Sequence, residues 1–146
     1  MSDQPGPDGL QQLQALQARG VRVPIGETMG FDLVEVERGR AVFSGNPDGR
    51  VYNPLGGVHG GYAATLLDSA CGIAVHSQIA AGQGYTTLEL KVSYLRGMTD
   101  ASGPVRAEGR VISMGRRVAF AEATLHDKDG RLCATATSTL LVIEPR

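Results

Sequence analysis

The segment from Tyr62 to Ala80 constrains the fold more than any other part of this sequence. Alanine, leucine, isoleucine and valine dominate these nineteen residues, which contain no proline and a single glycine. A run of this length and composition predicts one long α-helix. On a helical wheel the small and polar residues form one stripe, within about 100° of one another: Thr65, Asp68, Ser69, Gly72 and His76. A helix that is apolar on every other side must be buried by the rest of the chain.

Alternating and β-branched residues predict strands before and after this helix. The expected strands cover 31–37, 40–44, 85–95, 105–114, 118–126 and 132–143. Turn residues at 38–39 and 127–130 favour tight hairpins, and a run with leucine at every third position predicts a short amphipathic helix that ends before Gly20. The sequence therefore predicts an α+β fold, in which a curved antiparallel sheet of five to six strands wraps around one long central helix.

Length and composition indicate a single domain. The chain has 146 residues, 42% of them hydrophobic, which is enough for one core but short for two. Proline, glycine and aspartate in residues 1–9 predict a flexible N-terminus, and residues 10–146 form the domain. Fourteen basic and fifteen acidic residues give a net charge of -1, which argues against a nucleic-acid partner.

Neither targeting signals nor metal-binding spacings are evident. No segment has the length and hydrophobicity of a membrane span or the pattern of a secretory signal. Cys71 and Cys133 lie sixty-two residues apart, and neither they nor the three histidines match a zinc-site spacing. We therefore expect a cytoplasmic protein with reduced thiols, no metal and no membrane partner.

Glycines are concentrated just before the long helix. They make up 20 of the 146 residues, and four of them, Gly56, Gly57, Gly60 and Gly61, fall within six positions. A helix start offers unpaired N–H groups and a partial positive charge, and the missing side chains at Gly60 and Gly61 would let a substrate oxygen approach. The loop therefore has the character of an oxyanion-binding site. A flexible loop that needs positive φ angles is the alternative.

Asp68 is the only acidic residue between Asp48 and Glu89, and it lies on the polar stripe of the helix. A carboxylate there is either solvated or held for chemistry. It follows His59, which we interpret as shaping the loop, by nine residues, or about 13 Å along a helix axis. It therefore does not reach the helix start of its own chain. A symmetric dimer with antiparallel facing helices would bring it to Gly60 of the other chain.

These residues also carry a resemblance to a known family. The segment from Asn53 to Ala74 resembles the signature of hotdog-fold acyl-CoA thioesterases, especially the phenylacetate-pathway (PaaI-like) branch. The pattern combines an asparagine six residues before His-Gly-Gly with an acid nine residues after that histidine, and the likeness continues through 86–96. The resemblance implies a hotdog fold over residues 28–143 and a hydrolase that splits a thioester into a carboxylic acid and free CoA.

The resemblance also implies a role for each residue of the site. Asp68 is then the catalytic carboxylate, as general base or as nucleophile. The amide of Gly60, at the helix start of the partner subunit, polarises the thioester carbonyl, and Asn53 positions the carbonyl or the water. Thr87, in preference to Thr86, orients the carboxylate. The expected catalytic set is Asp68, Asn53, His59, Gly60 and Thr87.

Substrate contacts and partners complete the expectation. Gly61 and Tyr62 are expected to contact the substrate, with Tyr62, Ala63 and Leu66 bounding an acyl group at the dimer interface. Three cations at strand ends or turns would meet the CoA phosphates, or be ordinary solvated arginines: Arg96, Arg116 and Arg117. The expected partners are an acyl-CoA and further copies of the chain, as a homodimer and then a homotetramer built as a dimer of dimers. No cofactor is expected, because CoA is part of the substrate. The alternative function is a non-catalytic acyl-CoA-binding hotdog module.

Overall fold

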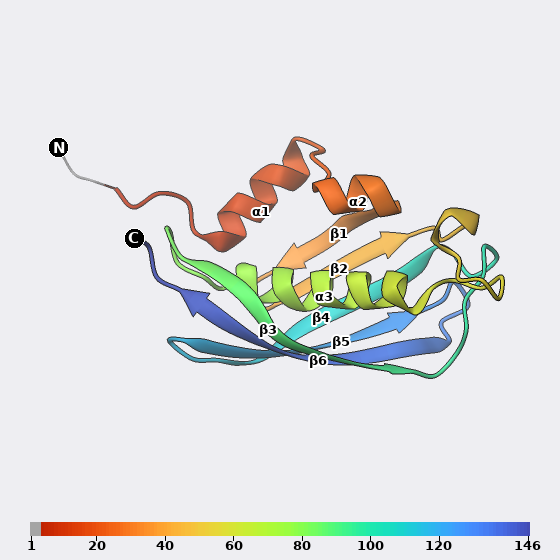
Figure 1. Ribbon diagram of the computed structural model, residues 1–146. Coiled ribbons are helices and arrows are strands. Elements are labelled where there is room, and N and C mark those ends of the chain that lie inside the picture. Colours follow the sequence, from red (N-terminus) through yellow and green to blue (C-terminus); the bar gives the residue numbers. More distant parts are fainter. Residues whose placement is uncertain (1–3) are drawn as a thin grey trace.

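The apolar run forms the central helix of the computed structural model, which describes residues 4–146 (Figure 1). This helix, α3 (Gly60–His76), begins two residues earlier and ends four residues earlier than the run predicted. It begins early because the His59 side chain caps it, accepting a hydrogen bond from the Gly61 N–H at 2.7 Å. It ends early because the N–H groups of Gln78 and Ile79 bond carbonyls three residues back, which tightens the chain out of the α-helix.

Six antiparallel strands form one curved sheet that wraps around α3 (Figure 1). The strands are β1 (Phe31–Glu37), β2 (Arg40–Gly45), β3 (Gly84–Tyr94), β4 (Val105–Met114), β5 (Val118–His126) and β6 (Leu132–Ile143). Their order across the sheet is β1-β2-β4-β5-β6-β3, so β1 and β3 are its two edges. The predicted bounds of β1, β4, β5 and β6 agree with the structure; β2 ends one residue later than predicted, and β3 both begins and ends one residue earlier. The predicted α+β fold is confirmed.

Two helices of the N-terminal segment lie against β1 (Figure 1). α1 (Gly9–Ala18) is the predicted amphipathic helix, and the N–H of Gly9 donates to the carbonyl of Ile79, just beyond α3. α2 (Pro24–Met29) was not predicted; it is a six-residue helix that ends at Gly30, whose φ is 76°. The flexibility expected of residues 1–9 stays a prediction, and residues 1–3 lie outside the described part. No helix within residues 4–146 is long and apolar enough to span a membrane.

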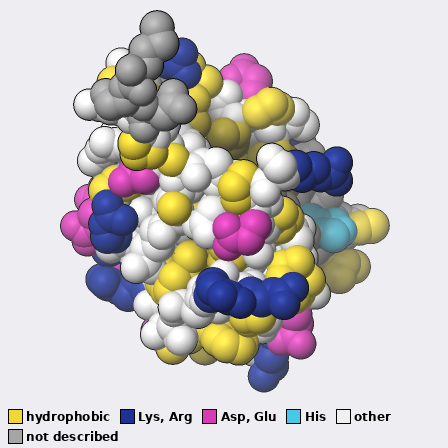
Figure 2. Space-filling view, turned by 90° about the vertical axis from the view of Figure 1, so that its left-hand side faces the viewer, with side chains coloured by type: hydrophobic (Ala, Val, Ile, Leu, Met, Phe, Trp, Pro, Cys, Tyr) yellow, Lys and Arg dark blue, Asp and Glu magenta, His cyan; other side chains and the backbone are white. Residues whose placement is uncertain are grey.

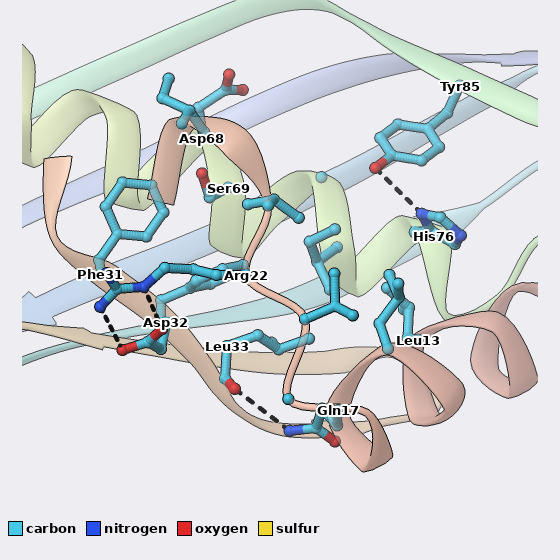
Figure 3. A pocket seen from close by; sticks show the side chains of 18 of the residues that line it. Leu13, Gln17, Arg22, Phe31, Asp32, Leu33, Asp68, Ser69, His76 and Tyr85 are labelled. Atoms are coloured by element: carbon cyan, nitrogen blue, oxygen red, sulfur yellow. Dashed lines mark hydrogen bonds and ion pairs between the residues drawn. The ribbon is translucent and has the colours of Figure 1, made fainter. Parts of the chain in front are cut away.

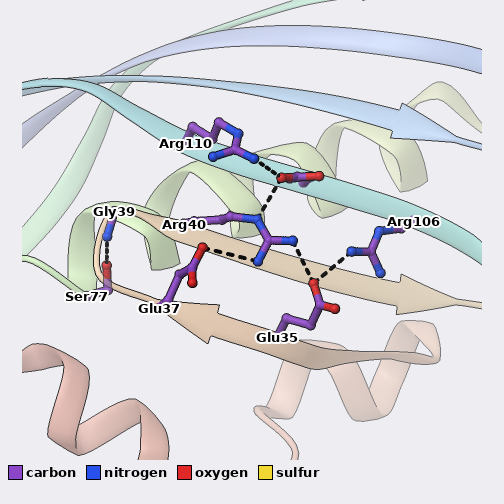
Figure 4. Close-up of polar contacts among 8 residues, drawn as sticks. Glu35, Glu37, Gly39, Arg40, Ser77, Arg106 and Arg110 are labelled. Carbon is purple, nitrogen blue, oxygen red and sulfur yellow. Dashed lines mark hydrogen bonds and ion pairs between the residues drawn. The ribbon is translucent and has the colours of Figure 1, made fainter.

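An ion-pair network joins the edge strand β1 to β2 and β4 (Figure 4). Arg40 on β2 contacts Glu35 on β1 and Glu108 on β4, each at 2.7 Å, and Arg106 on β4 also reaches Glu35 at 2.7 Å. These hydrogen bonds from arginine lower the pKa of both glutamates. A strand edge that carries several charges resists pairing with another chain. The network therefore marks β1 as the charged edge of the sheet.

Backbone contact between α3 and β4 requires glycine at one position. Ala70 of α3 is fully buried, and a Cβ added to Gly109 of β4 would overlap the Ala70 carbonyl. The helix can therefore lie directly on the sheet only because residue 109 has no side chain.

We expect Gly109→Ala to lower the free energy of unfolding by about 3 kcal/mol, because the added methyl must push α3 away from the sheet. Urea denaturation would measure the loss. Gly49→Ala is the control, since a Cβ at Gly49 meets nothing within 4 Å, and its effect should stay within about 0.5 kcal/mol. Equal stability of Gly109→Ala and wild type would contradict the backbone contact.

Candidate active site

Asp68 and Thr87 meet between α3 and β3. The Thr87 hydroxyl donates to Asp68 Oδ1 at 2.9 Å, and both residues are half-buried. Because side chains alternate along a strand, Thr86 points to the opposite face, where it is exposed. A β-bulge follows between Thr87 and Glu89. The structure thus brings Thr87, and not Thr86, to the Asp68 carboxylate.

A cavity of about 510 Å³ lies beside this carboxylate (Figure 3). Asp68, Ser69, Gly72 and His76 line it from α3, so four of the five residues in the predicted stripe share one space. Thr65, the fifth, donates its hydroxyl hydrogen bond to the Gly61 carbonyl instead. Much of the opposite wall is apolar and comes from the N-terminal segment and β1, including Leu13, Leu16, Val21, Val23, Phe31 and Leu33. A mainly apolar cavity of this size with a few polar groups is typical of a small-molecule site.

A second polar cluster lies one helical turn beyond Gly72, where His76 and Tyr85 line the cavity. His76 Nε2 lies 2.9 Å from Gln12 Oε1 on α1, and His76 Nδ1 lies 3.3 Å from the Tyr85 hydroxyl on β3. Burial lowers the pKa of His76 and raises the pKa of Tyr85. The cluster is therefore neutral at pH 7.

At the start of α3, the glycines are required by close contacts. The Tyr94 hydroxyl donates to the Gly60 carbonyl at 2.6 Å, and a Cβ on Gly60 would lie 3.1 Å from that hydroxyl. The Gly61 N–H is occupied by the His59 side chain. Within residues 4–146, no hydrogen bond uses the Gly60 N–H. The Gly60 amide, which the family resemblance assigns to the carbonyl, is thus free to donate, whereas the Gly61 amide is not.

Asn53 shapes the loop before the helix. Its Oδ1 accepts hydrogen bonds from the N–H groups of Leu55 and Gly57, at 2.9 and 3.3 Å, while its own N–H donates to the Gly57 carbonyl. His59 is tied into the same loop, since its N–H donates to the Val51 carbonyl at 2.7 Å. The loop is therefore ordered by hydrogen bonds, with Asn53 and His59 as its two anchors.

Asp68 and the helix start lie apart within one chain. Eight residues separate Gly60 from Asp68, which corresponds to about 12 Å along the axis of α3. Neither Gly60, His59 nor Asn53 lines the cavity beside Asp68. A single chain thus brings together Asp68 and Thr87, and separately Asn53, His59 and Gly60.

The side chains expected to bound the acyl group face elsewhere. Tyr62, Ala63 and Leu66 are at most 2% exposed and belong to the hydrophobic core. None of the three lines the cavity beside Asp68. On the helical wheel Ala63 and Leu66 lie on the apolar side of α3, whereas Tyr62 lies beside the polar stripe but in the first turn, well before Asp68.

The three candidate arginines lie at two ends of the sheet. Arg96 follows β3 and lines a surface pocket with His59 and Gly60. Arg116 and Arg117, in the turn between β4 and β5, line a separate pocket with Glu144. Figure 2 views the molecule from the side that shows this turn, and cationic, anionic and hydrophobic side chains are interspersed there. One chain therefore does not form a single cationic patch from these arginines.

Other candidate chemistry is disfavoured by burial. Burial raises the pKa of the Cys71 thiol to about 12, so it stays protonated and behaves as a core residue. No group of three or more His, Cys, Asp or Glu side chains in the described part of the chain could hold a metal ion.

Sequence reasoning missed the outer wall of the cavity. Val21, Val23 and Ile25 line it although each is more than a third exposed. No periodicity marks this segment, so the only signal available was a cluster of apolar residues between two helices. Tyr85 and Gln12 were missed as well, because their pairing with His76 depends on the tertiary fold.

The comparisons with known proteins decide the family. The model of the Thioesterase superfamily matches residues 55–134. The chain belongs to the thioesterase superfamily. It is 28% identical over 120 residues to a 1,4-dihydroxy-2-naphthoyl-CoA hydrolase of Listeria monocytogenes, covering 82% of this chain and 96% of that one. The sequence-based expectation of a thioester hydrolase is confirmed at this level.

Solved structures agree on the fold. A thioesterase family protein of Silicibacter pomeroyi superposes with a TM-score of 0.80 at 30% identity, over 93% of this chain and 98% of that one. The PaaI protein of Escherichia coli superposes with a TM-score of 0.81, over 91% and 94% of the two chains, and at 19% identity it supports the fold alone. The expected PaaI-like hotdog fold is confirmed.

The half-buried His76 of this thioesterase makes a pH dependence testable. In the unfolded chain His76 has an ordinary pKa near 6.5, whereas in the folded chain burial lowers it. The stability that neutral His76 contributes is complete above about pH 6.5 and is lost as the pH falls toward the folded-state pKa. We expect the Tm of His76→Gln to fall less than that of wild type between pH 7 and pH 5. Parallel Tm curves would contradict the lowered pKa.

Proposed function

We propose that this thioesterase hydrolyses acyl-CoA thioesters with Asp68 as its catalytic carboxylate. The observation that carries the proposal is the Asp68 carboxylate held by Thr87 at the wall of a cavity of about 510 Å³. The carboxylate is half-buried, so it is not fully solvated. No cation pairs with it among residues 4–146, so no salt bridge offsets its charge. A half-buried, oriented and unpaired carboxylate is suited to chemistry rather than to stability.

The hydrogen bond from Thr87 determines which oxygen of the Asp68 carboxylate is available to react. It occupies Oδ1 and leaves Oδ2 without a partner in the described residues. As a general base, Oδ2 takes a proton from water while the water oxygen adds to the thioester carbon. As a nucleophile, Oδ2 itself adds to that carbon, and water then hydrolyses the anhydride. In both routes the carbon–sulfur bond breaks, and the thiolate of CoA leaves and is protonated.

Charge that develops on the carbonyl oxygen needs a donor that Asp68's own chain does not supply. The free N–H of Gly60, at the positive end of α3, is suited to that role in a second copy of the chain. β3 offers the means, since it has eleven residues and pairs only with β6 in the described chain. Leu88, on β3, and Leu95, just beyond it, are each 58% exposed, and no ion-pair network like that at β1 covers this edge among the described residues.

Antiparallel pairing of two β3 strands would assemble the site. Thr87, which holds Asp68, lies near the beginning of β3. Tyr94, which holds the Gly60 carbonyl, is its last residue. A twofold axis between two such strands puts the end of one beside the beginning of the other. The Gly60 amide of one copy then approaches the Asp68 carboxylate of the other, and a homodimer has two sites.

The same twofold symmetry would bring together the arginines that are candidates to bind the phosphates of CoA. Arg96 lies beyond the end of β3, whereas Arg116 and Arg117 lie at the end of the sheet where β3 begins. Across the proposed axis, Arg96 of one copy approaches Arg116 and Arg117 of the other. Guanidinium groups so placed suit the phosphates of CoA.

We expect Asp68→Asn to lower thiol release from acyl-CoA esters by about 10² to 10⁴-fold, because the amide keeps the shape but cannot take the proton or attack. Release of CoA would be followed with a thiol reagent across phenylacetyl-, benzoyl-, hexanoyl- and palmitoyl-CoA. Asp129→Asn, in the exposed turn before β6, is the matched control and should keep wild-type rates. Undiminished hydrolysis by Asp68→Asn would refute the assignment, and binding without hydrolysis by wild type would favour the non-catalytic module.

Mixing two inactive variants tests the shared site. Gly60→Pro deletes the free amide at the first helical position, where proline is tolerated, and Gly60→Ala adds a Cβ but keeps the amide. We expect Gly60→Pro to be much less active than Gly60→Ala. A refolded equal mixture of Asp68→Asn and Gly60→Pro should recover about a quarter of wild-type activity, because half the dimers are mixed and each has one intact site. No recovery, with mixed dimers verified by two affinity tags, would place both groups in one subunit.

A further inference from the structure

His76 and Tyr85 line a part of the cavity that hydrolysis itself does not use, and Gln12, outside the lining, bonds to His76. His76 lies eight residues after Asp68, about 12 Å along α3. Tyr85 lies two residues before Thr87, so both side chains point from β3 into the same cavity. Figure 3 shows Asp68 and the His76–Tyr85 pair separated along the cavity. An acyl group whose carbonyl is at Asp68 therefore has this cluster at its far end.

A chain of hydrogen bonds fixes the direction of every proton in the cluster. The Gln12 side-chain NH₂ donates to the Pro7 carbonyl at 3.0 Å, which orients the amide so that Oε1 faces His76. Oε1 can only accept, so His76 Nε2 carries the ring proton and donates to it at 2.9 Å. Since the ring is neutral at pH 7, Nδ1 is an acceptor. The Tyr85 hydroxyl must then donate its only proton to Nδ1, at 3.3 Å.

Tyr85 consequently offers the cavity lone pairs and no proton. The two rings pack edge to face, with centroids 5.2 Å apart, which restrains the phenol. Two other polar groups of the cavity have partners: one N–H of Gln17 donates to the Leu33 carbonyl at 3.4 Å, and Arg22 pairs with Asp32 at 2.6 Å. At the far end of the cavity, Tyr85 thus presents an acceptor to a ligand.

Resting on the thioesterase function proposed above, we infer that Tyr85 is a specificity-determining residue that selects acyl groups with a hydroxyl at the end remote from the thioester. That hydroxyl donates to the Tyr85 oxygen, whose own proton is held by His76. Gln12 and His76 are positioning residues, since they act only by keeping the Tyr85 proton away from the ligand. An ether oxygen at the same place has no proton to donate and meets the lone pairs of Tyr85 unfavourably.

The test compares esters that differ only at the remote end. Wild type is assayed with hexanoyl-, 6-hydroxyhexanoyl- and 6-methoxyhexanoyl-CoA, and with 3-phenylpropanoyl-CoA and its 4-hydroxyphenyl and 4-methoxyphenyl counterparts. We expect kcat/KM to be about tenfold higher for the hydroxyl than for the methoxy ester in at least one series, the value of one neutral hydrogen bond. The series that shows the preference tells an aliphatic acyl group from an aromatic one.

Two variants separate selection from structural damage. Tyr85→Phe should bring the hydroxyl-to-methoxy ratio close to one while the unsubstituted ester is still hydrolysed. Gln12→Met frees the His76 ring to take its other tautomer, so Tyr85 can donate, and the ratio should fall toward or below one. A merely structural role for Gln12 would lower all rates together and leave the ratio unchanged. Tyr52→Phe, outside the cavity, is the control and should keep the wild-type ratio.

Outcomes that overturn the inference are distinct from those that overturn the proposed function. If wild type hydrolyses hydroxyl and methoxy esters equally in both series, or if Tyr85→Phe keeps the preference, the inference is wrong and the thioesterase assignment stands. If no ester is hydrolysed, the proposed function fails. The rise in Tm of wild type and Tyr85→Phe with each ester then decides the inference, because selective binding needs no catalysis.

Discussion

The burial of α3 on all sides but one is the constraint on which the rest of the structure depends. The curved sheet covers its apolar faces, and Gly109 permits backbone contact with Ala70. The polar stripe cannot be buried in the same way, because its carboxylate and imidazole need partners. β3 and α1 supply those partners through Thr87, Tyr85 and Gln12. The side chains that satisfy the stripe therefore also define the cavity beside it.

Much of the fold could be predicted because the strands alternate clearly and the helix is long. The bounds of β4, β5 and β6 follow from alternation between turns rich in glycine and aspartate. The ends of α3 could not be predicted from propensity, since a histidine cap at His59 extends it over two glycines. α2 carries too few residues for any periodicity. Its place depends on a proline at its first position and a glycine in the left-handed conformation after it.

The candidate site, like the fold, could be predicted from the sequence only in part. The separation of Asp68 from Gly60 followed from the rise of a helix, and the structure agrees with it. The choice of Thr87 over Thr86 came from the family resemblance and matches the hydrogen bond to Asp68. The outer wall of the cavity could be predicted only in part. Leu13, Leu16, Phe31 and Leu33 belong to elements that the sequence predicts, whereas Val21, Val23 and Ile25 come from a segment without a pattern. Reasoning from nearby sequence favoured Tyr62 instead, whose side chain is committed to the core.

Gly72 shows how the two ends of the cavity depend on each other. It lies on the stripe between Asp68 and His76, and a Cβ there would lie 3.4 Å from the Tyr85 ring. A small side chain at this position would already touch the ring, and a larger one would fill the space between carboxylate and phenol. The missing side chain at Gly72 thus leaves the Asp68 carboxylate and the Tyr85 phenol at two ends of one open cavity. Alanine at this position would favour the helix by about 1 kcal/mol, so in the function proposed above the glycine leaves room for the acyl group at a cost in helix stability.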